Sequence, residues 1–232
     1  MENENAVGES WKPFYRKGNL SWYDPKKADR NFVQRFSESE WITRLLALSE
    51  IPLQGRILEA GCGTGMYSVA LSLLGYRLEA FDYNEEALQI AEDLAGRVFQ
   101  GESPVKFYQN NLLKMTAGSN TYDLVFNQAV LEYFNDPSDR KKIYREMARA
   151  AKPGGAVAVM VQHTAHPFRK FWEKMGWRGY ADQPPVTLLD AKTLKNELEE
   201  AGLRTSAWMG FILGKPCFSG LIGRGVLKVL KI

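Results

Sequence analysis

Three glycines at alternating positions, Gly61, Gly63 and Gly65, form the most informative pattern in this chain of 232 residues. They follow the β-favouring run Arg56–Ala60 and precede an apolar run that begins at Met66. This order predicts a buried strand, a tight turn and the start of a helix. Glycine suits a turn in which the backbone takes a positive φ or a ligand approaches the main chain. Because such a turn places free N–H groups and a positive helix end beside a ligand, we predict a cofactor site here.

Asp82 is a second candidate for the same site. It ends the apolar segment Arg77–Phe81, about 17 residues beyond Gly65. An acid at the carboxyl end of the second strand lies beside the glycine turn, where it can accept both ribose hydroxyls of an adenosine. The alternative is a structural role in capping the helix that Asn84 is expected to begin. The two roles are compatible, and the ribose role is favoured.

Four side chains near the ends of later strands could take a proton from a reacting group. Glu132 and Tyr133 follow the predicted fourth strand, and the two histidines of the chain, His163 and His166, follow the fifth. Histidine has an unperturbed pKa of about 6.5, which suits a base near neutral pH. His163 is the better candidate because it is nearer the strand end. The alternative is that both histidines cap or solvate a surface loop.

Five segments stand in a fixed order along the chain: Glu59–Gly65 with its G-x-G-x-G spacing, Asp82, Val105–Leu112, Tyr122–Pro137 and Lys152–Val161. Together they resemble the motifs of the class I S-adenosylmethionine-dependent methyltransferases, in the small-molecule branch that includes methyltransferase type 11. The resemblance covers roughly Arg56 to Val161. A nicotinamide-binding turn would more often have the spacing G-x-G-x-x-G, and Met66 stands at the third glycine of that pattern.

The resemblance implies that S-adenosylmethionine is the cofactor and S-adenosylhomocysteine the product. It assigns cofactor binding to the glycine turn and to residues that follow or end the next strands: Glu59, Gly61, Cys62, Gly63, Gly65, Asp82, Tyr83, Asn111, Leu112, Asn127 and Gln128. Asn111 stands where the family usually has an acid that takes the adenine amino group, and its amide oxygen can still accept that bond. Cys62 is interpreted as a packing residue of the turn. The candidate catalytic residues are His163, Glu132 and Tyr133.

Strand and helix patterns alternate from Arg56 onward, which predicts an α/β fold with a parallel sheet and helices on both faces. The resemblance implies a Rossmann-like, doubly wound, seven-stranded sheet that is mostly parallel, with one antiparallel strand. Two parts are expected: an N-terminal lid or helical extension over residues 1–50 and the methyltransferase domain over residues 51–232. The tail 221–232 fits either the last antiparallel strand or a short basic amphipathic helix. The strand is favoured because the fold needs one there.

The N-terminal extension is rich in large aromatic side chains between residues 11 and 36. We expect residues 1–10 to be disordered and residues 11–36 to form a lid over the cofactor, because large aromatic side chains on a loop-like stretch need a surface to cover. The sequence Ser37-Glu38-Ser39-Glu40 fits a capping box that starts a helix.

Composition argues against several classes of protein. A net charge of +3, from 30 basic and 27 acidic side chains, is too balanced to indicate nucleic-acid binding by long-range attraction, without excluding it. The two cysteines, Cys62 and Cys217, give neither a disulfide framework nor zinc spacing, and no metal is expected. The polar, acidic N-terminus has no signal-peptide pattern, and no apolar run approaches the roughly 20 residues that a membrane span needs. We therefore expect one cytoplasmic α/β domain.

The sequence predicts an enzyme that transfers a methyl group from S-adenosylmethionine to a small molecule by O-, N- or carboxylate methylation. Asn127-Gln128-Ala129-Val130 replaces the Asn/Asp-Pro-Pro-aromatic sequence of enzymes that methylate the exocyclic amine of a base. Three alternatives remain: a tRNA-modifying methyltransferase, a protein that binds the cofactor without catalysis, and a nicotinamide-dependent oxidoreductase. The acceptor, the need for a base and the choice between monomer and dimer stay open.

Overall fold

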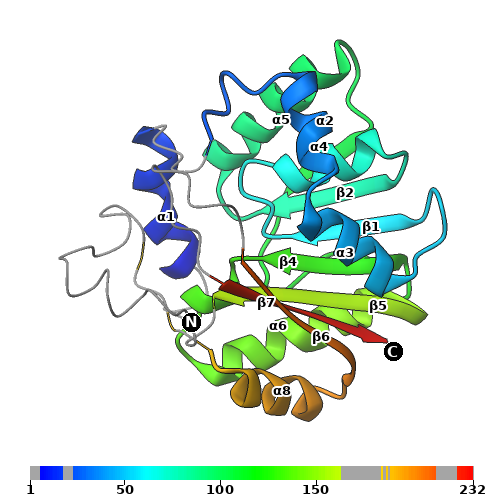
Figure 1. Cartoon of the computed structure of the whole chain (residues 1–232). Helices are drawn as coiled ribbons and strands as arrows, with labels where there is room; N and C mark the ends of the chain where they lie inside the picture. The colour runs from blue at the N-terminus through cyan, green and yellow to red at the C-terminus, as the bar shows by residue number, and fades with distance from the viewer. Residues whose placement is uncertain are drawn as a thin grey trace.

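A seven-stranded sheet forms the centre of the computed structural model (Figure 1). The structure describes residues 6–17, 23–162, 184, 187, 189–212 and 224–231, with residues 17, 162, 204–212 and 224–231 described by their backbone alone. The strands are β1 (Arg56–Ala60), β2 (Arg77–Asp82), β3 (Val105–Gln109), β4 (Tyr122–Gln128), β5 (Ala151–Gln162), β6 (Arg204–Ile212) and β7 (Arg224–Lys231).

The strands follow the order β3-β2-β1-β4-β5-β7-β6 across the sheet. Strands β1 to β5 pair in parallel, whereas β7 runs antiparallel to both of its neighbours. The predicted α/β fold with a mostly parallel sheet is confirmed. The tail of the chain forms strand β7 rather than a basic helix.

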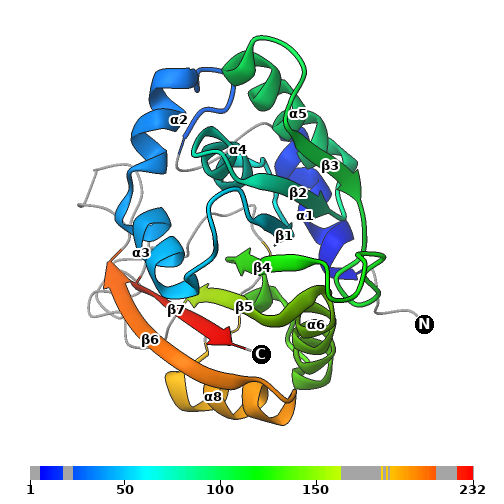
Figure 2. The same ribbon diagram turned by 90° about the vertical axis from the view of Figure 1, so that its right-hand side faces the viewer.

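Helices cover both faces of the sheet. They are α1 (Ala6–Lys17), α2 (Arg30–Ser37), α3 (Glu40–Ser49), α4 (Met66–Leu73), α5 (Glu85–Phe99), α6 (Pro137–Ala150) and α8 (Ala191–Glu200), with a 3-10 turn, η1, at Leu131–Tyr133. Figure 2 shows α6 and α8 on one side of the sheet and α3 and α4 on the other. Because successive side chains of a strand point to opposite faces, Ile57 of β1 packs with α4 while Leu58 and Ala60 pack with α6.

Local capping signals start two of these helices. The Asp136 side chain accepts a hydrogen bond from the N–H of Ser138 at the start of α6, and Pro137 occupies the first helical position. The Asp190 side chain accepts a hydrogen bond from the N–H of Thr193 at the start of α8. Each bond satisfies an N–H group that the helix itself leaves without a partner.

The start of the chain differs from expectation. Residues 6–10 form the first turns of α1, so the expected disorder of residues 1–10 is wrong for the described part of that segment. Residues 11–36 are likewise more regular than a loop, because they contain the rest of α1 and nearly all of α2.

The expected capping box is also wrong, because Ser37 lies at the end of one helix and not at the start of the next. Asp29 caps α2 by accepting a hydrogen bond from the N–H of Phe32, and the last turn of α2 includes Ser37. The hydroxyl of Ser37 donates to a carbonyl within that turn. Ser39 then has the extended backbone of an N-cap before α3.

The order of the strands reverses between β1 and β4, because β2 lies on one side of β1 and β4 on the other. In open α/β sheets, ligands bind outside the carboxyl ends of the strands at such a point. The loops that follow β1, β2 and β4 meet at this edge, and α1 lies across it (Figure 1). The candidate functional site is therefore at this edge of the sheet.

Candidate functional site

The turn between β1 and α4 has the backbone conformation that requires glycine. Gly61, Gly63 and Gly65 have φ angles of +83°, +51° and +72°, which residues with a side chain rarely adopt. The N–H groups of Gly61 and Cys62 both donate to the carbonyl of Phe81 at 2.9 Å. The predicted strand, turn and helix are confirmed, and the turn is fixed to the carboxyl end of β2.

The three glycines differ in what surrounds them. A Cβ atom on Gly65 would lie 2.7 Å from the Cβ of Ala91, and one on Gly61 would lie 2.9 Å from a methyl group of Val130. Those two glycines therefore permit close packing of the turn against its neighbours. At Gly63, by contrast, the hydroxyl oxygen of Tyr15 is the only atom of the described residues, apart from Gly63 and its two chain neighbours, within 4 Å of that position. The middle of the turn is the part that a ligand can approach.

Asp82, at the end of β2, is bonded directly to the turn. Its Oδ2 accepts the N–H of Gly63 at 2.8 Å, and its Oδ1 accepts the N–H of Asn84 at 2.9 Å. Burial raises the pKa of Asp82, and the backbone N–H groups of Asn84 and Gly63 oppose that rise. Since each carboxylate oxygen has a further lone pair, Asp82 can tie the turn to α5 and still accept hydroxyl groups of a ligand. The residues present therefore fit an adenosine-containing cofactor.

Glu59 lies beneath the turn and is almost fully enclosed, with 1% of its surface exposed. Its Oε2 and the hydroxyl of Ser68 on α4 are 2.5 Å apart. Burial raises the pKa of Glu59 to about 8 from its ordinary value of 4.5. Near neutral pH this side chain is therefore mostly an uncharged acid that joins β1 to α4.

Cys62 behaves as a packing residue. Its side chain is buried, and burial raises the pKa of its thiol. Because the thiolate is the reactive form of cysteine, the structure gives Cys62 no feature of a nucleophile.

Three predicted cofactor residues lie after β2 and β3. The hydroxyl of Tyr83 donates to the Glu9 carboxylate at 3.2 Å. The side-chain oxygen of Asn111 accepts the N–H of Leu113 at 2.9 Å, so it already stabilises its own turn. A methyl group of Leu112 approaches the glycine turn, 3.7 Å from where a Cβ on Gly61 would lie. The hydrogen bond from an adenine to Asn111 remains a prediction. It would use the second lone pair of the Asn111 side-chain oxygen.

Asn127 and Gln128 form the end of β4, and their side chains differ in exposure. Asn127 is fully buried, and its Nδ2 lies 3.4 Å from the sulfur of Met147 on α6. No described residue supplies a hydrogen-bond partner for its Oδ1. Gln128 is half-buried. Because the Asn127 side chain points toward α6, a contact with the cofactor would fall to its backbone or to Gln128.

Glu132 and Tyr133 both lie in η1, the turn after β4, and both side chains are buried. The carbonyl of Glu132 accepts the N–H of Thr187 at 2.6 Å. Burial raises the pKa of Tyr133, and the nearby Glu132 raises it further. The phenol of Tyr133 therefore stays protonated and can donate a hydrogen bond but cannot serve as a base near neutral pH.

The predicted base lies outside the described residues. Both His163 and His166 follow Gln162, where β5 ends at the same edge of the sheet as the glycine turn. The assignment of His163 as a base therefore stays a prediction.

The structure adds a residue that the sequence did not single out. Tyr15 comes from α1, the helix that lies across the site, and its hydroxyl oxygen lies 3.1 Å from where a Cβ on Gly63 would stand. Burial raises the pKa of Tyr15, and the carboxylate of Asp82 contributes to that rise. The only signal in the sequence was the clustering of aromatic residues near the N-terminus.

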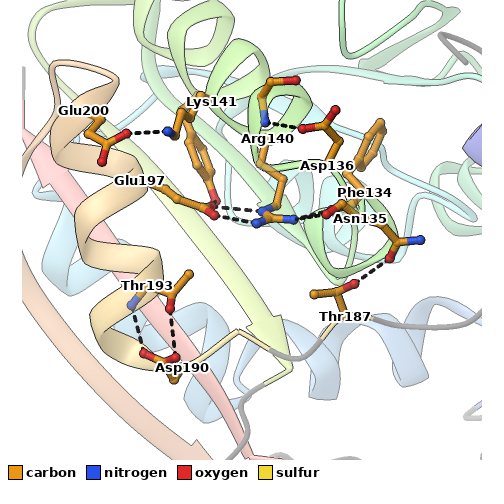
Figure 3. Close-up of polar contacts among 12 residues, drawn as sticks. Phe134, Asn135, Asp136, Arg140, Lys141, Thr187, Asp190, Thr193, Glu197 and Glu200 are labelled. Atoms are coloured by element: carbon orange, nitrogen blue, oxygen red, sulfur yellow. Dashed lines mark hydrogen bonds and ion pairs between the residues drawn. The ribbon is translucent and has the colours of Figure 1, made fainter.

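A network of buried charges supports the turn that carries Glu132 and Tyr133 (Figure 3). The Arg140 guanidinium on α6 donates to the carbonyl of Phe134 at 2.6 Å, just beyond that turn. It also donates to both carboxylate oxygens of Glu197 on α8, at 2.9 and 2.5 Å. The side chains of Arg140 and Glu197 are 3% and 7% exposed. The ion pair therefore joins α6, α8 and the end of the loop after β4.

The described residues contain neither a metal-binding cluster nor a helix that could span a membrane. No group of three or more His, Cys, Asp or Glu side chains in that part of the chain could hold a metal ion. None of the helices described is long and apolar enough to cross a membrane.

The known proteins to which this chain is similar are methyltransferases. The family described as "Methyltransferase domain" matches residues 33–207. The chain is 34% identical over 143 residues to a ubiquinone biosynthesis O-methyltransferase of Bordetella avium, which covers 59% of this chain and 54% of that protein. It is 27% identical over 141 residues to a demethylmenaquinone methyltransferase of Bacillus licheniformis, covering 60% and 56%. The chain thus spans about half the length of the curated relatives it matches.

Solved structures share the fold. A SAM-dependent methyltransferase from Methanosarcina mazei superposes with a TM-score of 0.63 at 21% identity, covering 78% of this chain and 94% of that one. At this level of identity the likeness concerns the fold alone.

Proposed function

Because this chain belongs to the family of class I S-adenosylmethionine-dependent methyltransferases, we propose that it transfers a methyl group from that cofactor to a small-molecule acceptor. When bound, S-adenosylmethionine supplies an electrophilic methyl group on a sulfonium. The task of the protein is to hold the acceptor in line with that group and to exclude water. We assign the first task to the edge of the sheet and the second to α1.

The hydrogen bond between Gly63 and Asp82 is the observation that carries this proposal. It joins the one approachable glycine of the turn to an acid at the end of the neighbouring strand, 2.8 Å away. A ligand that lies on Gly63 is thereby within reach of the Asp82 carboxylate. We assign the ribose hydroxyls of the cofactor to Asp82, because a carboxylate accepts hydroxyl protons and the acid is already oriented by two backbone N–H groups.

The acceptor side of the site is aromatic. Trp11 of α1 packs edge-on against Tyr133, with ring centroids 4.7 Å apart, and against Phe14 at 5.1 Å. Such side chains favour a small acceptor with an apolar or planar part. The names of two relatives, from ubiquinone and menaquinone chemistry, agree with an acceptor of this class.

Proton removal belongs to the same side of the site. A hydroxyl or protonated amine must lose a proton when it is methylated, and we assign this step to His163, with Glu132 as the second candidate. Tyr133 is assigned to hydrogen-bond donation, because burial raises the pKa of its phenol. An acceptor that is already a carboxylate would need no base.

The purified chain, incubated with S-adenosylmethionine and a panel of phenols, quinols, amines, carboxylic acids and tRNA, tests the proposal through release of S-adenosylhomocysteine. We expect release with at least one small molecule, and its loss in Asp82→Ala. Release with tRNA alone would replace the small-molecule acceptor by a modified nucleotide. Binding of the cofactor without release from any member of a broad panel would favour a binding protein and contradict the assignment as an enzyme.

A further inference from the structure

The hydroxyl of Tyr15 lies close to the middle glycine of the turn. It lies 3.1 Å from the point where a Cβ on Gly63 would stand, at the least crowded of the three glycines of the turn. The groups that act on the Tyr15 phenol come from both halves of the site: Asp82 and Cys62 from the cofactor side and Tyr133 from the acceptor side. The Tyr15 hydroxyl therefore lies beside the part of the glycine turn that a bound cofactor would approach.

Several contacts hold α1 in the position that directs Tyr15 to the turn. The ring of Tyr83 packs so closely on Gly8 that a Cβ there would lie 2.1 Å from the ring. The Tyr83 hydroxyl donates to Glu9 at 3.2 Å, and the Arg16 guanidinium donates to Glu86 on α5 at 2.9 Å. These contacts lie along α1 on both sides of Tyr15, so its position is fixed by the helix as a whole.

The phenol of Tyr15 can act at this position as a hydrogen-bond donor. Burial raises the pKa of Tyr15, and the carboxylate of Asp82 raises it further, so the phenol keeps its proton near neutral pH. The nearby N-terminus of α4 also favours an anion, because its first N–H groups have no partners within the helix. Among the described groups that shift the pKa of the Tyr15 phenol most, the one charged group is the Asp82 carboxylate. A protonated phenol can donate a hydrogen bond to an anionic group of a ligand at this point.

We infer that Tyr15 binds the cofactor by donating its phenolic proton to the carboxylate of the methionine part. The ribose hydroxyls are donors and match the acceptor Asp82, whereas the carboxylate is the one anionic group of the cofactor and needs donors. A helix that reaches over the sheet thus completes the cofactor site of the core. This inference rests on the family cofactor and adds a residue from outside the five motifs of the core.

Two ligands distinguish a contact between Tyr15 and the carboxylate from a general disturbance of the binding site. S-adenosylhomocysteine contains the carboxylate, whereas 5′-methylthioadenosine has the same adenosine and thioether without the amino-acid part. Titration calorimetry on the full chain should show that Tyr15→Phe weakens S-adenosylhomocysteine about tenfold or more, the effect of losing a hydrogen bond to a charged group. The affinity for 5′-methylthioadenosine should change by less than about twofold.

Tyr83→Phe is the matched control, because it removes a phenolic hydroxyl that donates to Glu9 on α1. It should affect the two ligands equally. An equal loss of both ligands in Tyr15→Phe, or no loss of either, would overturn the carboxylate contact while leaving the proposed function intact. Failure of the unaltered chain to bind either ligand would instead overturn the proposed function and this inference with it.

Discussion

At the scale of the single residue, Asp82 has the structural role that the sequence suggested and can still take the proposed ribose contact. Its carboxylate stabilises both the glycine turn and the start of α5, through the N–H groups of Gly63 and Asn84. Neither bond uses all of its lone pairs. The two backbone hydrogen bonds orient the Asp82 carboxylate toward the turn. The proposed contact with a ligand therefore depends on the structural role of Asp82.

Replacing Asp82 by alanine should weaken the binding of S-adenosylhomocysteine by about 1.5–3 kcal/mol, the range for hydrogen bonds to a charged group. Calorimetric titration of the variant measures this loss, and a melting curve without ligand establishes that the variant is folded. A folded variant with unchanged affinity would reduce Asp82 to a helix cap.

Glu59 predicts a dependence of stability on pH. Its pKa is about 8 in the folded chain and about 4.5 when exposed. Between these values the folded state holds a proton that the unfolded state has released, so stability falls as pH rises through this window. The fall can reach about 1.4 kcal/mol per pH unit for one proton. Glu59→Gln, which cannot titrate, should lose this contribution.

Urea unfolding of both proteins from pH 5 to pH 8 measures the effect as a difference in slope. Glu92→Gln on the exposed side of α5 is the control, and its curve should run parallel to that of the unaltered chain. If the Glu59→Gln curve also runs parallel to that of the unaltered chain, Glu59 is ionised in the folded state. Burial would then not raise the pKa of Glu59 in the folded chain.

At the scale of the element, α1 depends on a glycine that serves packing rather than a turn. Gly8→Ala introduces a Cβ about where the Tyr83 ring lies, and the overlap should displace α1. Overpacking of this kind costs about 1–3 kcal/mol. Hydrogen exchange followed by mass spectrometry should therefore show faster exchange across residues 6–17.

Gly96→Ala is the matched control for this change. Gly96 is also a helical glycine, in α5, but no described atom lies within 4 Å of its Cβ position. That substitution should stabilise the chain by up to about 1 kcal/mol and leave exchange in α1 unchanged. Unchanged exchange in Gly8→Ala as well would mean that α1 is not held by its contact with Tyr83.

The pairing of α6 with α8 gives a second prediction at this scale. Glu197→Gln would leave the buried Arg140 guanidinium without its counter-charge, which should cost about 3–5 kcal/mol in denaturant unfolding. Glu200→Gln, on the same helix, removes an ion pair with Lys141 in which the carboxylate is 59% exposed. Because solvent screens that pair, its loss should cost no more than about 1 kcal/mol. Similar losses in the two variants would contradict a special role for the buried pair.

Elements with local signals could be predicted from the sequence, and contacts between distant elements could not. Asp136 and Asp190 start helices through bonds within the next three residues, and the spacing of the glycines determines the turn. Ser37 and Ser39 both resemble N-caps, and only the presence of α2 decides between them. The side chain of Asn127 follows the pleat of β4 toward α6, although its place at the strand end suggested the ligand.

At the scale of the whole molecule, the proposed site is divided between two parts of the chain. In this proposal the sheet and its loops supply the glycine turn and Asp82, and the N-terminal helix supplies Tyr15 and an aromatic cover. The sequence assigns residue numbers to the first part of this proposed site because its motifs are local. It predicted only an aromatic lid for the second, because the contact between Tyr15 and Gly63 spans residues that share no local pattern.

Calorimetric titration of the full chain with S-adenosylhomocysteine, and in parallel with NAD⁺, tests the central claim most directly. A cofactor site built from the G-x-G-x-G turn and Asp82 should bind S-adenosylhomocysteine at one site per chain and show no heat of binding with NAD⁺. The bound ligand should also raise the melting temperature, because it stabilises only the folded state. Binding of NAD⁺ without binding of S-adenosylhomocysteine would contradict the claim.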